Sequence, residues 1–196
     1  MSANFLKQQL RQKIRCERKQ LSKYQQKTLS EKIACNVKQQ SLFKKSEKIA
    51  FYLCHQKEVD PHLLQQEALK LGKGIYLPAL HPHLKNTLVF AKITSQTIFT
   101  KNKYGILEPD INTCHTILPW QLDLILVPLV AFDRQCNRLG MGGGYYDRAL
   151  AFKQKCQSTT MTMGLAYNFQ QKNYIPHSAQ DIRLDAIATE KFFYTK

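Results

Sequence analysis

The sequence predicts an α/β protein whose sheet is largely parallel and covered by helices on both faces. Short apolar runs with β-branched and aromatic residues alternate with segments of helical periodicity, which is the pattern of parallel strands joined by helices. The first forty residues are helical in pattern, so a helical N-terminus is expected before the first strand. The 196 residues contain no internal repeat, low-complexity tract or linker, and we therefore expect one domain over residues 1–196.

The N-terminal helix is expected to have an apolar face and a basic face. The apolar face repeats every four residues, at Leu6, Leu10 and Ile14. The adjacent face carries four cations about one turn apart, at Lys7, Arg11, Arg15 and Arg18. On its own, such a row is more typical of a solvated helix face than of a binding site.

A second helix is predicted after a short break. Ser22 and Gln25 have the spacing of a capping box, in which each side chain bonds the backbone N–H of the other residue. The helix is expected to run to about residue 40, with a buried stripe at Leu29, Ile33 and Val37.

The rest of the chain alternates between strands and helices. Strands are expected at residues 48–54, 74–80, 87–93, 123–133, 159–167 and 184–194. One helix is expected with Asp60 as N-cap, Pro61 at its first position and Gly72 at its end. Another is expected from Asp147 to about Lys155.

The charge balance points to an anionic partner. The chain has 29 Lys+Arg against 14 Asp+Glu, a formal net charge of +15. This excess attracts nucleic acid, an anionic membrane or a phosphorylated small molecule. A basic composition without any specific partner explains the charge equally well.

The cysteines and the hydropathy pattern favour a cytoplasmic protein with reduced thiols. The six cysteines form no C-x-x-C pair, which argues against a zinc site, and they stand at positions Cys16, Cys35, Cys54, Cys114, Cys136 and Cys156. No apolar signal segment precedes them, which argues against secretion and a disulfide framework. The longest apolar run, residues 123–132, is too short to cross a membrane.

The stretch "RLGMGGGYYDRAL", residues 138–150, is the strongest functional signal. It follows a predicted strand and precedes a predicted helix, which is where α/β sheets bind ligands. Its glycines let backbone N–H groups approach an anion closely, so we expect a phosphate-binding loop. It is not a Walker A loop, because no Gly-Lys-Ser/Thr closes it, and Tyr145 replaces the last glycine of G-x-G-x-x-G. The alternative is a tight turn with glycines at positive φ.

Asp147 follows the glycines and offers a hard oxygen ligand. Such a ligand suits the Mg²⁺ that accompanies a nucleotide. The alternative role for Asp147 is as N-cap of the next helix, and the two roles are compatible.

The glycine stretch resembles the signature of the 5-formyltetrahydrofolate cyclo-ligases, also called 5,10-methenyltetrahydrofolate synthetases. The segments "KQQLRQKIRCER", "KEVD", "YGILEP", "DLILVPLVAFD" and "DIRLDAIATE" fall in the order of that family and span nearly the whole chain. The resemblance implies a three-layer, Rossmann-like sandwich. It also implies the ATP- and Mg²⁺-dependent cyclisation of 5-formyltetrahydrofolate to 5,10-methenyltetrahydrofolate, with release of ADP and phosphate.

The resemblance also implies roles for individual residues. The implied ATP-binding positions are Lys7, Gln8, Gln9, Leu10 and Arg11 in the first helix, and Arg138, Leu139, Gly140, Met141, Gly142, Gly143, Gly144, Tyr145 and Tyr146 in the glycine loop. The implied folate-binding positions are Leu53, Glu58, Met141, Gly142, Gly143, Gly144 and Tyr145. The implied Mg²⁺ ligands are Asp147 and Asp181, and the implied catalytic residues are Lys7, Arg138 and Tyr145. Without the resemblance, Leu53 reads as core, Asp181 as a turn cap and the tyrosines as helix-start packing.

The chain departs from the family pattern at two places. Cys136 stands where members commonly carry glycine, so the turn before Arg138 is expected to differ slightly. The segment from Pro176 to Asp181 lacks the Glu and His that members often show there, although Asp181 itself is kept.

Two other functions fit parts of the pattern. A nucleic-acid-binding protein would use the positive charge, but no recognisable nucleic-acid motif is present. A different phosphate enzyme, such as a sugar-phosphate isomerase, would need no ATP. If the chain is a cyclo-ligase, we expect a folate substrate with or without a polyglutamate tail. We also expect no nucleic-acid or membrane partner, and a monomer or weak dimer.

Overall fold

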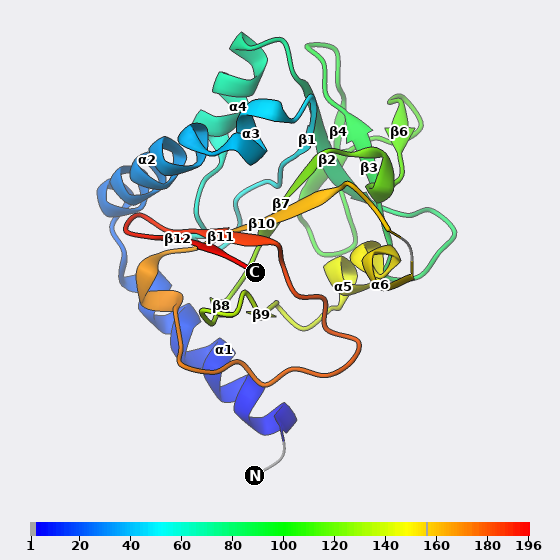
Figure 1. The fold of residues 1–196 in the computed structure, drawn as a ribbon. Coiled ribbons are helices and arrows are strands. Elements are labelled where there is room, and N and C mark those ends of the chain that lie inside the picture. Colours follow the sequence, from blue (N-terminus) through cyan, green and yellow to red (C-terminus); the bar gives the residue numbers. More distant parts are fainter. Residues whose placement is uncertain (1–2, 156) are drawn as a thin grey trace.

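An eight-stranded sheet forms the centre of the molecule (Figure 1). The computed structural model describes residues 3–155 and 157–196. From edge to edge the strands are β12 (Phe193–Thr195), β11 (Ala186–Ala188), β10 (Met161–Leu165), β7 (Leu124–Pro128), β1 (Lys48–Ala50), β2 (Gly74–Leu80), β3 (Leu88–Lys92) and β6 (Thr116–Ile117). The five strands from β11 to β2 are parallel, and β12, β3 and β6 are antiparallel to their neighbours. The predicted, largely parallel α/β sheet is confirmed.

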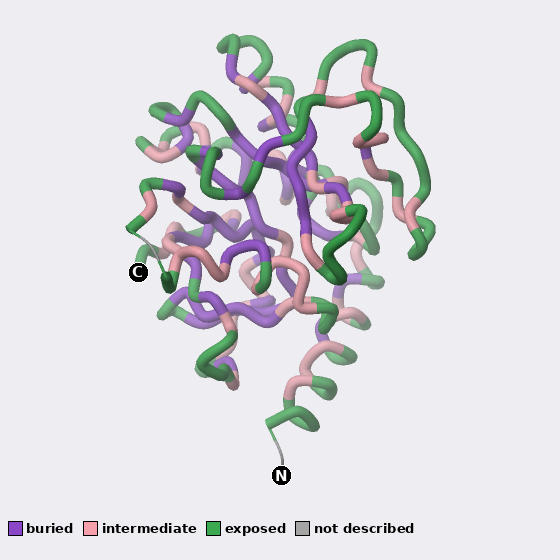
Figure 2. Tube along the Cα trace, turned by 90° about the vertical axis from the view of Figure 1, so that its right-hand side faces the viewer, coloured by how far each residue is buried: buried purple, intermediate pink, exposed green. Residues whose placement is uncertain are grey.

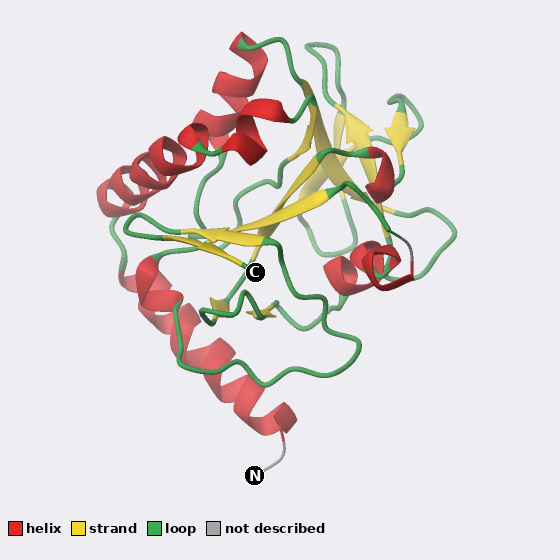
Figure 3. Ribbon diagram, viewed as in Figure 1, coloured by secondary structure: helices red, strands yellow, loops and turns green. Residues whose placement is uncertain are grey.

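Helices cover both faces of the sheet (Figure 3). One face packs against α2 (Lys23–Gln39), α3 (Ser41–Lys45) and α4 (His62–Lys70), with Ile33, Val37 and Leu64 in the shared core. The other face packs against α5 (Tyr145–Leu150), α6 (Phe152–Lys155) and the short turn η1 (Pro119–Gln121). Figure 2 shows the buried chain running through the middle of the molecule, between these two layers.

The N-terminal helix α1 (Ala3–Gln20) lies below the sheet, next to a small hairpin (Figure 1). The hairpin pairs β8 (Ala131–Phe132) with β9 (Arg138–Leu139). Ile14 of α1 is fully buried and packs in a small cluster with Val130, Ala131 and Leu139. The predicted apolar face is therefore used only in part, because Leu6, nearer the N-terminus, is 41% exposed.

Local sequence signals explain several helix ends. The capping box of α2 forms as predicted: the Ser22 hydroxyl accepts from the Gln25 N–H, and the Gln25 side chain accepts from the Ser22 N–H. Helix α4 begins one residue later than predicted, with Pro61 at the N-cap position. The Asp60 carboxylate still accepts from the N–H of His62, the first helical residue.

Four predicted elements differ from those observed. Residues 123–133 form two strands, β7 and β8, because the chain leaves the sheet after Pro128 to enter the hairpin. Residues 184–194 likewise hold β11 and the start of β12, and residues 147–155 form parts of two short helices. The strand at 48–54 is shorter, although Phe51 and Tyr52 remain buried beyond its end. A further hairpin, β4 (Phe99–Lys101) with β5 (Leu107–Pro109), was not predicted.

No helix among the described residues is long and apolar enough to cross a membrane. The five described cysteines are free thiols, and Cys156 lies outside the described residues.

Cys136 has a left-handed backbone conformation in the turn that joins β8 to β9. Its φ is 63°, and its side chain is fully buried. Left-handed conformations favour glycine, because a Cβ atom crowds the backbone there. The turn is held by Asp133, whose carboxylate accepts from the N–H groups of Gln135 and Asn137. The position thus has the conformation of a glycine but carries a side chain.

Replacing Cys136 tests this conformation. We expect Cys136→Gly to stay within about 1 kcal/mol of the wild type, since the relief of left-handed strain offsets the lost packing. Cys136→Val should lose about 2 kcal/mol or more, because a β-branched residue is poorly tolerated at positive φ. Urea unfolding measures both, with Cys35→Val at an exposed position of helix α2 as control. A valine variant as stable as the wild type would contradict the assignment.

Candidate functional site

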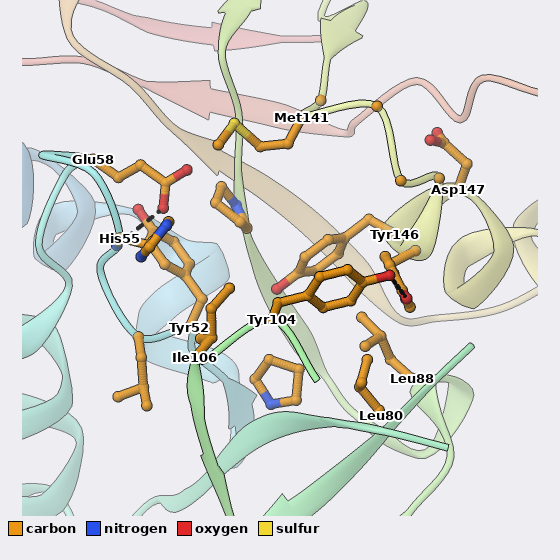
Figure 4. A pocket seen from close by; sticks show the side chains of 18 of the residues that line it. Tyr52, His55, Glu58, Leu80, Leu88, Tyr104, Ile106, Met141, Tyr146 and Asp147 are labelled. Carbon is orange, nitrogen blue, oxygen red and sulfur yellow. Dashed lines mark hydrogen bonds between the residues drawn. The ribbon is translucent and has the colours of Figure 1, made fainter. Parts of the chain in front are cut away.

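A cavity of about 580 Å³ opens at the carboxyl ends of three adjacent parallel strands. It is lined there by Tyr52 after β1, Leu80 at the end of β2 and Pro128 at the end of β7. This edge is where open α/β sheets bind ligands, and the volume is that of an ordinary small-molecule site. Figure 4 shows Glu58, His55 and Tyr52 gathered at one end of the cavity and Asp147 at the other.

The glycine loop lines one wall of this cavity. Gly142 and Gly144 have positive φ, at 104° and 66°, and Gly144 is the N-cap of α5. A Cβ on Gly143 would lie 2.9 Å from the ring of Tyr145, which is too close. The loop is therefore both a tight, glycine-dependent turn and a cavity wall that leads into a helix N-terminus.

Two cations of α1 connect the first helix to this wall. The Lys7 ammonium lies 2.8 Å from the Asp181 carboxylate, in a partly buried ion pair. The Arg11 Nε donates to the carbonyl oxygen of Gly140 at 2.8 Å. Burial lowers the pKa of Arg11, and the neighbouring charge of Arg15 lowers it further. The Arg11 charge therefore lies in a partly desolvated place where an anion would be favoured.

The two aspartates of the site are both paired with cations. The Asp147 Oδ1 accepts from Arg138 Nη2 at 2.7 Å and from the Ile182 N–H at 3.2 Å. Two opposing effects act on the pKa of Asp181. Burial raises this pKa, but the hydrogen bond and charge of Lys7 and the hydrogen bonds from Ser178 lower it, and the net shift is downward. Both aspartates line the cavity.

The opposite end of the cavity holds Glu58. Glu58 is 6% exposed and lies 3.5 Å from the guanidinium of Arg18. Burial raises the pKa of Glu58, and Arg18 is the largest opposing effect. Leu53 and Tyr52 line the cavity beside it, and the Tyr52 hydroxyl donates to the backbone of Val59.

Tyrosines from two elements cross the cavity between its ends. The hydroxyls of Tyr145 and Tyr104 are 2.7 Å apart, and Tyr145 also donates to the Asn86 side chain. The Tyr146 hydroxyl is buried and has no hydrogen-bond partner among the described residues. Burial, with the charge of Glu58, raises the pKa of Tyr146, so this lining residue keeps a protonated hydroxyl.

The structure brings most of the predicted site residues together. The cavity is lined by Lys7, Arg11, Leu53, Glu58, Arg138, Leu139, Gly140, Met141, Gly142, Gly143, Gly144, Tyr145, Tyr146, Asp147 and Asp181. Gln8 and Gln9 are exposed on α1, and Leu10 packs in the small cluster around Ile14, so these three stay outside the lining. Arg138 and Leu139 belong to strand β9 instead of the loop itself.

Sequence reasoning missed several lining residues. These are Tyr52, His55, Pro78, Leu80, Leu88, Asn102, Tyr104, Ile106, Leu107, Glu108 and Pro128. The segments "YGILEP" and "KEVD" held part of the signal, since Tyr104, Ile106, Leu107 and Glu108 fall in the first and Glu58 in the second. The β4–β5 hairpin that carries "YGILEP" has no strand periodicity long enough to be recognised.

Comparison with known proteins identifies the family. The sequence model of the 5-formyltetrahydrofolate cyclo-ligase family matches residues 4–190. This chain belongs to the 5-formyltetrahydrofolate cyclo-ligase family. It is 36% identical to the 5-formyltetrahydrofolate cyclo-ligase of Haemophilus influenzae, over 91% of this chain and 94% of that protein.

Two solved structures of the cyclo-ligase family agree with the fold. The NMR structure of Aquifex aeolicus 5,10-methenyltetrahydrofolate synthetase matches with a TM-score of 0.82 and 36% identity, over 97% of this chain and 92% of that one. The Mycoplasma pneumoniae 5,10-methenyltetrahydrofolate synthetase matches with a TM-score of 0.73 and 26% identity, over 94% and 98%. The chain is accordingly a cyclo-ligase of folate metabolism.

The Lys7–Asp181 pair makes stability depend on pH. Because the pKa of Asp181 is lowered by folding, its contribution is present above the unfolded pKa of about 4 and is lost as pH falls through the folded value. We expect Lys7→Met to lose under about 1 kcal/mol near neutral pH, since both groups are partly exposed. This deficit should shrink between about pH 5 and pH 3.

Urea unfolding over that pH range measures the difference, with Lys13→Met on the exposed side of α1 as control. A deficit that stays constant as the pH falls would show that Lys7 does not stabilise the Asp181 carboxylate.

Proposed function

We propose that this enzyme cyclises 5-formyltetrahydrofolate to 5,10-methenyltetrahydrofolate in a reaction that consumes ATP and requires Mg²⁺. One observation carries the proposal. A single cavity is lined toward one end by two cations and a glycine backbone, and at the other by a buried carboxylate among aromatic and apolar side chains. The first end suits a polyphosphate, and the second suits a planar ring with N–H donors.

The nucleotide is assigned to the α1 and glycine-loop end. Lys7 and Arg11 are one helical turn apart and both line the cavity, so they can face one polyphosphate. The positive φ of Gly142 and Gly144 turns backbone N–H groups in a way that most residues cannot adopt. The Arg11 charge gains an anionic partner when the phosphates bind, which favours binding.

The donor set of Asp147 and Asp181 fits Mg²⁺. The hydrogen bonds of the Asp147 carboxylate among the described residues fall on Oδ1, and those of Asp181 fall on Oδ2. Each side chain therefore keeps a second oxygen for another ligand. Mg²⁺ is usually held by one or two carboxylates plus phosphate oxygens and water, and it would neutralise phosphate charge here. Among the described residues, no group of three or more His, Cys, Asp or Glu side chains is suited to hold a metal. A site made of two carboxylates, phosphate oxygens and water needs no third ligand of these types from the protein.

The folate is assigned to the Glu58 end. A carboxylate can accept hydrogen bonds from the N–H groups of a pterin, while Leu53 and the tyrosine rings offer apolar and stacking surfaces. Met141 to Tyr145 of the glycine loop line the same cavity as Glu58, so we assign contacts with the folate as well as with the nucleotide to them. The excess of positive charge suits a folate with a polyglutamate tail.

The proposed chemistry has two steps. The formyl oxygen attacks the γ-phosphorus of ATP, an O–P bond forms, and ADP leaves. The folate N10 then attacks the activated formyl carbon, phosphate departs with the former formyl oxygen, and N10 loses its proton to solvent. In the first step Lys7 and Arg138 neutralise charge on the transferred phosphoryl group, and Tyr145 orients the formyl group. The cytoplasmic location and the monomeric or weakly dimeric state stay predictions.

The direct test mixes the protein with 5-formyltetrahydrofolate and MgATP and follows the near-ultraviolet absorbance of the methenyl product. We expect a rise that requires ATP and stops when a chelator removes Mg²⁺. A rise of equal rate without nucleotide, or none with it, would refute the proposal. A salt titration of RNA and DNA binding tests the alternative, and binding that persists at physiological salt would favour it.

The glycine loop has its own test. Gly142→Ala places a Cβ at φ 104°, within 3.5 Å of the Arg11 guanidinium, and should raise the KM for MgATP about tenfold, which corresponds to about 1.4 kcal/mol of distortion. Gly72→Ala is the matched control, because it also has positive φ but lies away from the cavity with open space around it. The control should lose stability without a change in KM. Equal KM values for Gly142→Ala and the wild type would remove the loop from nucleotide binding.

A further inference from the structure

Arg18 is a buried cation whose charge is directed at Glu58. It lies in the last turn of α1, is 1% exposed, and is the largest of the fully buried side chains in the described part of the chain. Its nearest charged partner is the Glu58 carboxylate, 3.5 Å from Nη1. The guanidinium nitrogens have no hydrogen-bond partner among the described residues. Burying a cation in this way costs free energy, because the charge loses its hydration. The burial must therefore be offset by a favourable interaction or be retained for function.

The backbone around Glu58 is held by the end of the same helix. Gln56 and Lys57 both have positive φ, so the turn before Glu58 is tight and strained. The Lys57 ammonium donates to the carbonyl oxygens of Lys19 and Leu21 at the end of α1, where the helix carries partial negative charge. The carboxylate also accepts from the His55 N–H, so its position is set by α1 and by its own turn.

Glu58 itself lines the cavity, whereas Arg18 does not. The titratable and charged groups around Glu58 come from four segments. They are Arg18 and Arg15 from α1, Tyr52, Cys54 and His55 from the segment after β1, Tyr146 from α5, and Tyr167 after β10, whose hydroxyl donates to the Glu58 carbonyl oxygen. Of these, Arg18 is the strongest influence that favours the ionised carboxylate, and burial works against it. Loss of Arg18 would remove the largest influence that lowers the pKa of Glu58, so this pKa would rise further.

We propose that Arg18 is a positioning residue, which keeps the Glu58 carboxylate ionised and oriented toward the cavity. Arg18 thereby sets the affinity of Glu58 for the ring N–H groups of the folate, without itself touching the folate. This inference rests on the proposed assignment of Glu58 to the folate end. Buried ion pairs contribute little to net stability, so a role in keeping an acceptor ready for substrate accounts better for the pair than stability does. A carboxylate accepts stronger hydrogen bonds than a protonated carboxyl group, which explains the gain in affinity.

The first experiment needs no substrate. Infrared difference spectra at neutral pH compare the wild type with Arg18→Met, which keeps a long apolar stem but removes the charge. We expect a protonated-carboxyl band in Arg18→Met that is absent in the wild type, absent in Arg18→Lys, and abolished by Glu58→Gln in the Arg18→Met background. The absence of this band in folded Arg18→Met overturns the inference, whatever the reaction of the enzyme.

The second experiment measures kinetics across pH. Arg18→Met should raise the KM for 5-formyltetrahydrofolate at least about tenfold at neutral pH, the loss of one charge-assisted hydrogen bond, while the KM for MgATP changes much less. The folate KM should recover as pH rises through the raised pKa of Glu58, whereas that of the wild type stays flat over the same range. Arg18→Lys should restore most of the affinity. Equal increases in both KM values, independent of pH, would assign Arg18 a structural role only.

A folding control keeps the test decisive. Arg18→Met leaves Glu58 buried without a cationic partner, and this variant can fail to fold for that reason. The double variant Arg18→Met/Glu58→Gln removes both charges and should fold. If Arg18→Met does not fold, Arg18→Lys is compared with the double variant instead. The inference requires that Arg18→Lys has a folate KM like that of the wild type. It also requires that the double variant has a raised folate KM that does not depend on pH. Similar folate KM values in both variants would overturn it.

Discussion

The row of cations along α1 is the contact on which the site depends. The four side chains are Lys7, Arg11, Arg15 and Arg18, and in that order they contact Asp181, Gly140, Met141 and Glu58. These partners come from segments far apart in the chain, so one helix face fixes the glycine loop, the C-terminal loop and the turn at the opposite end of the cavity. The helix itself is anchored by Ile14 against the β8–β9 hairpin. Weakening this docking would separate the two ends of the site.

The same arrangement leaves the site electrostatically incomplete until ligands bind. Two side chains that line the cavity show this: Arg11 is partly desolvated and donates to a carbonyl oxygen, and the Tyr146 hydroxyl has no hydrogen-bond partner among the described residues. These groups are costly to bury alone. Their presence around one cavity is explained if a phosphate chain and a polar ring supply the missing partners, which is the proposed nucleotide and folate. Part of the free energy needed to desolvate these groups is therefore spent on folding and not on ligand binding.

The sequence predicted the layers of the fold and much of the site, and the misses have physical causes. The Ser22–Gln25 capping box and the strand at 74–80 were predicted correctly because both are local patterns. Periodicity predicts one strand over residues 123–133, whereas the structure has two, because periodicity does not reveal where a buried run leaves the sheet. The pairing of Arg18 with Glu58 was missed because it joins residues forty positions apart, and the basic row looked like a solvated face. The sequence motifs predicted the part of the cavity wall that their own residues form, and they gave no signal for lining residues outside the motifs, such as Pro78, Leu80 and Leu88.

In the proposed reaction, ATP and folate meet in one cavity, where the formyl oxygen attacks the terminal phosphate directly. The most direct measurement uses 5-formyltetrahydrofolate labelled with ¹⁸O in the formyl group. A single turnover with unlabelled MgATP should release inorganic phosphate that carries one ¹⁸O atom from the formyl group, as mass spectrometry would detect. Unlabelled phosphate, with the ¹⁸O recovered in water, would contradict direct transfer and would separate ATP cleavage from the cyclisation step.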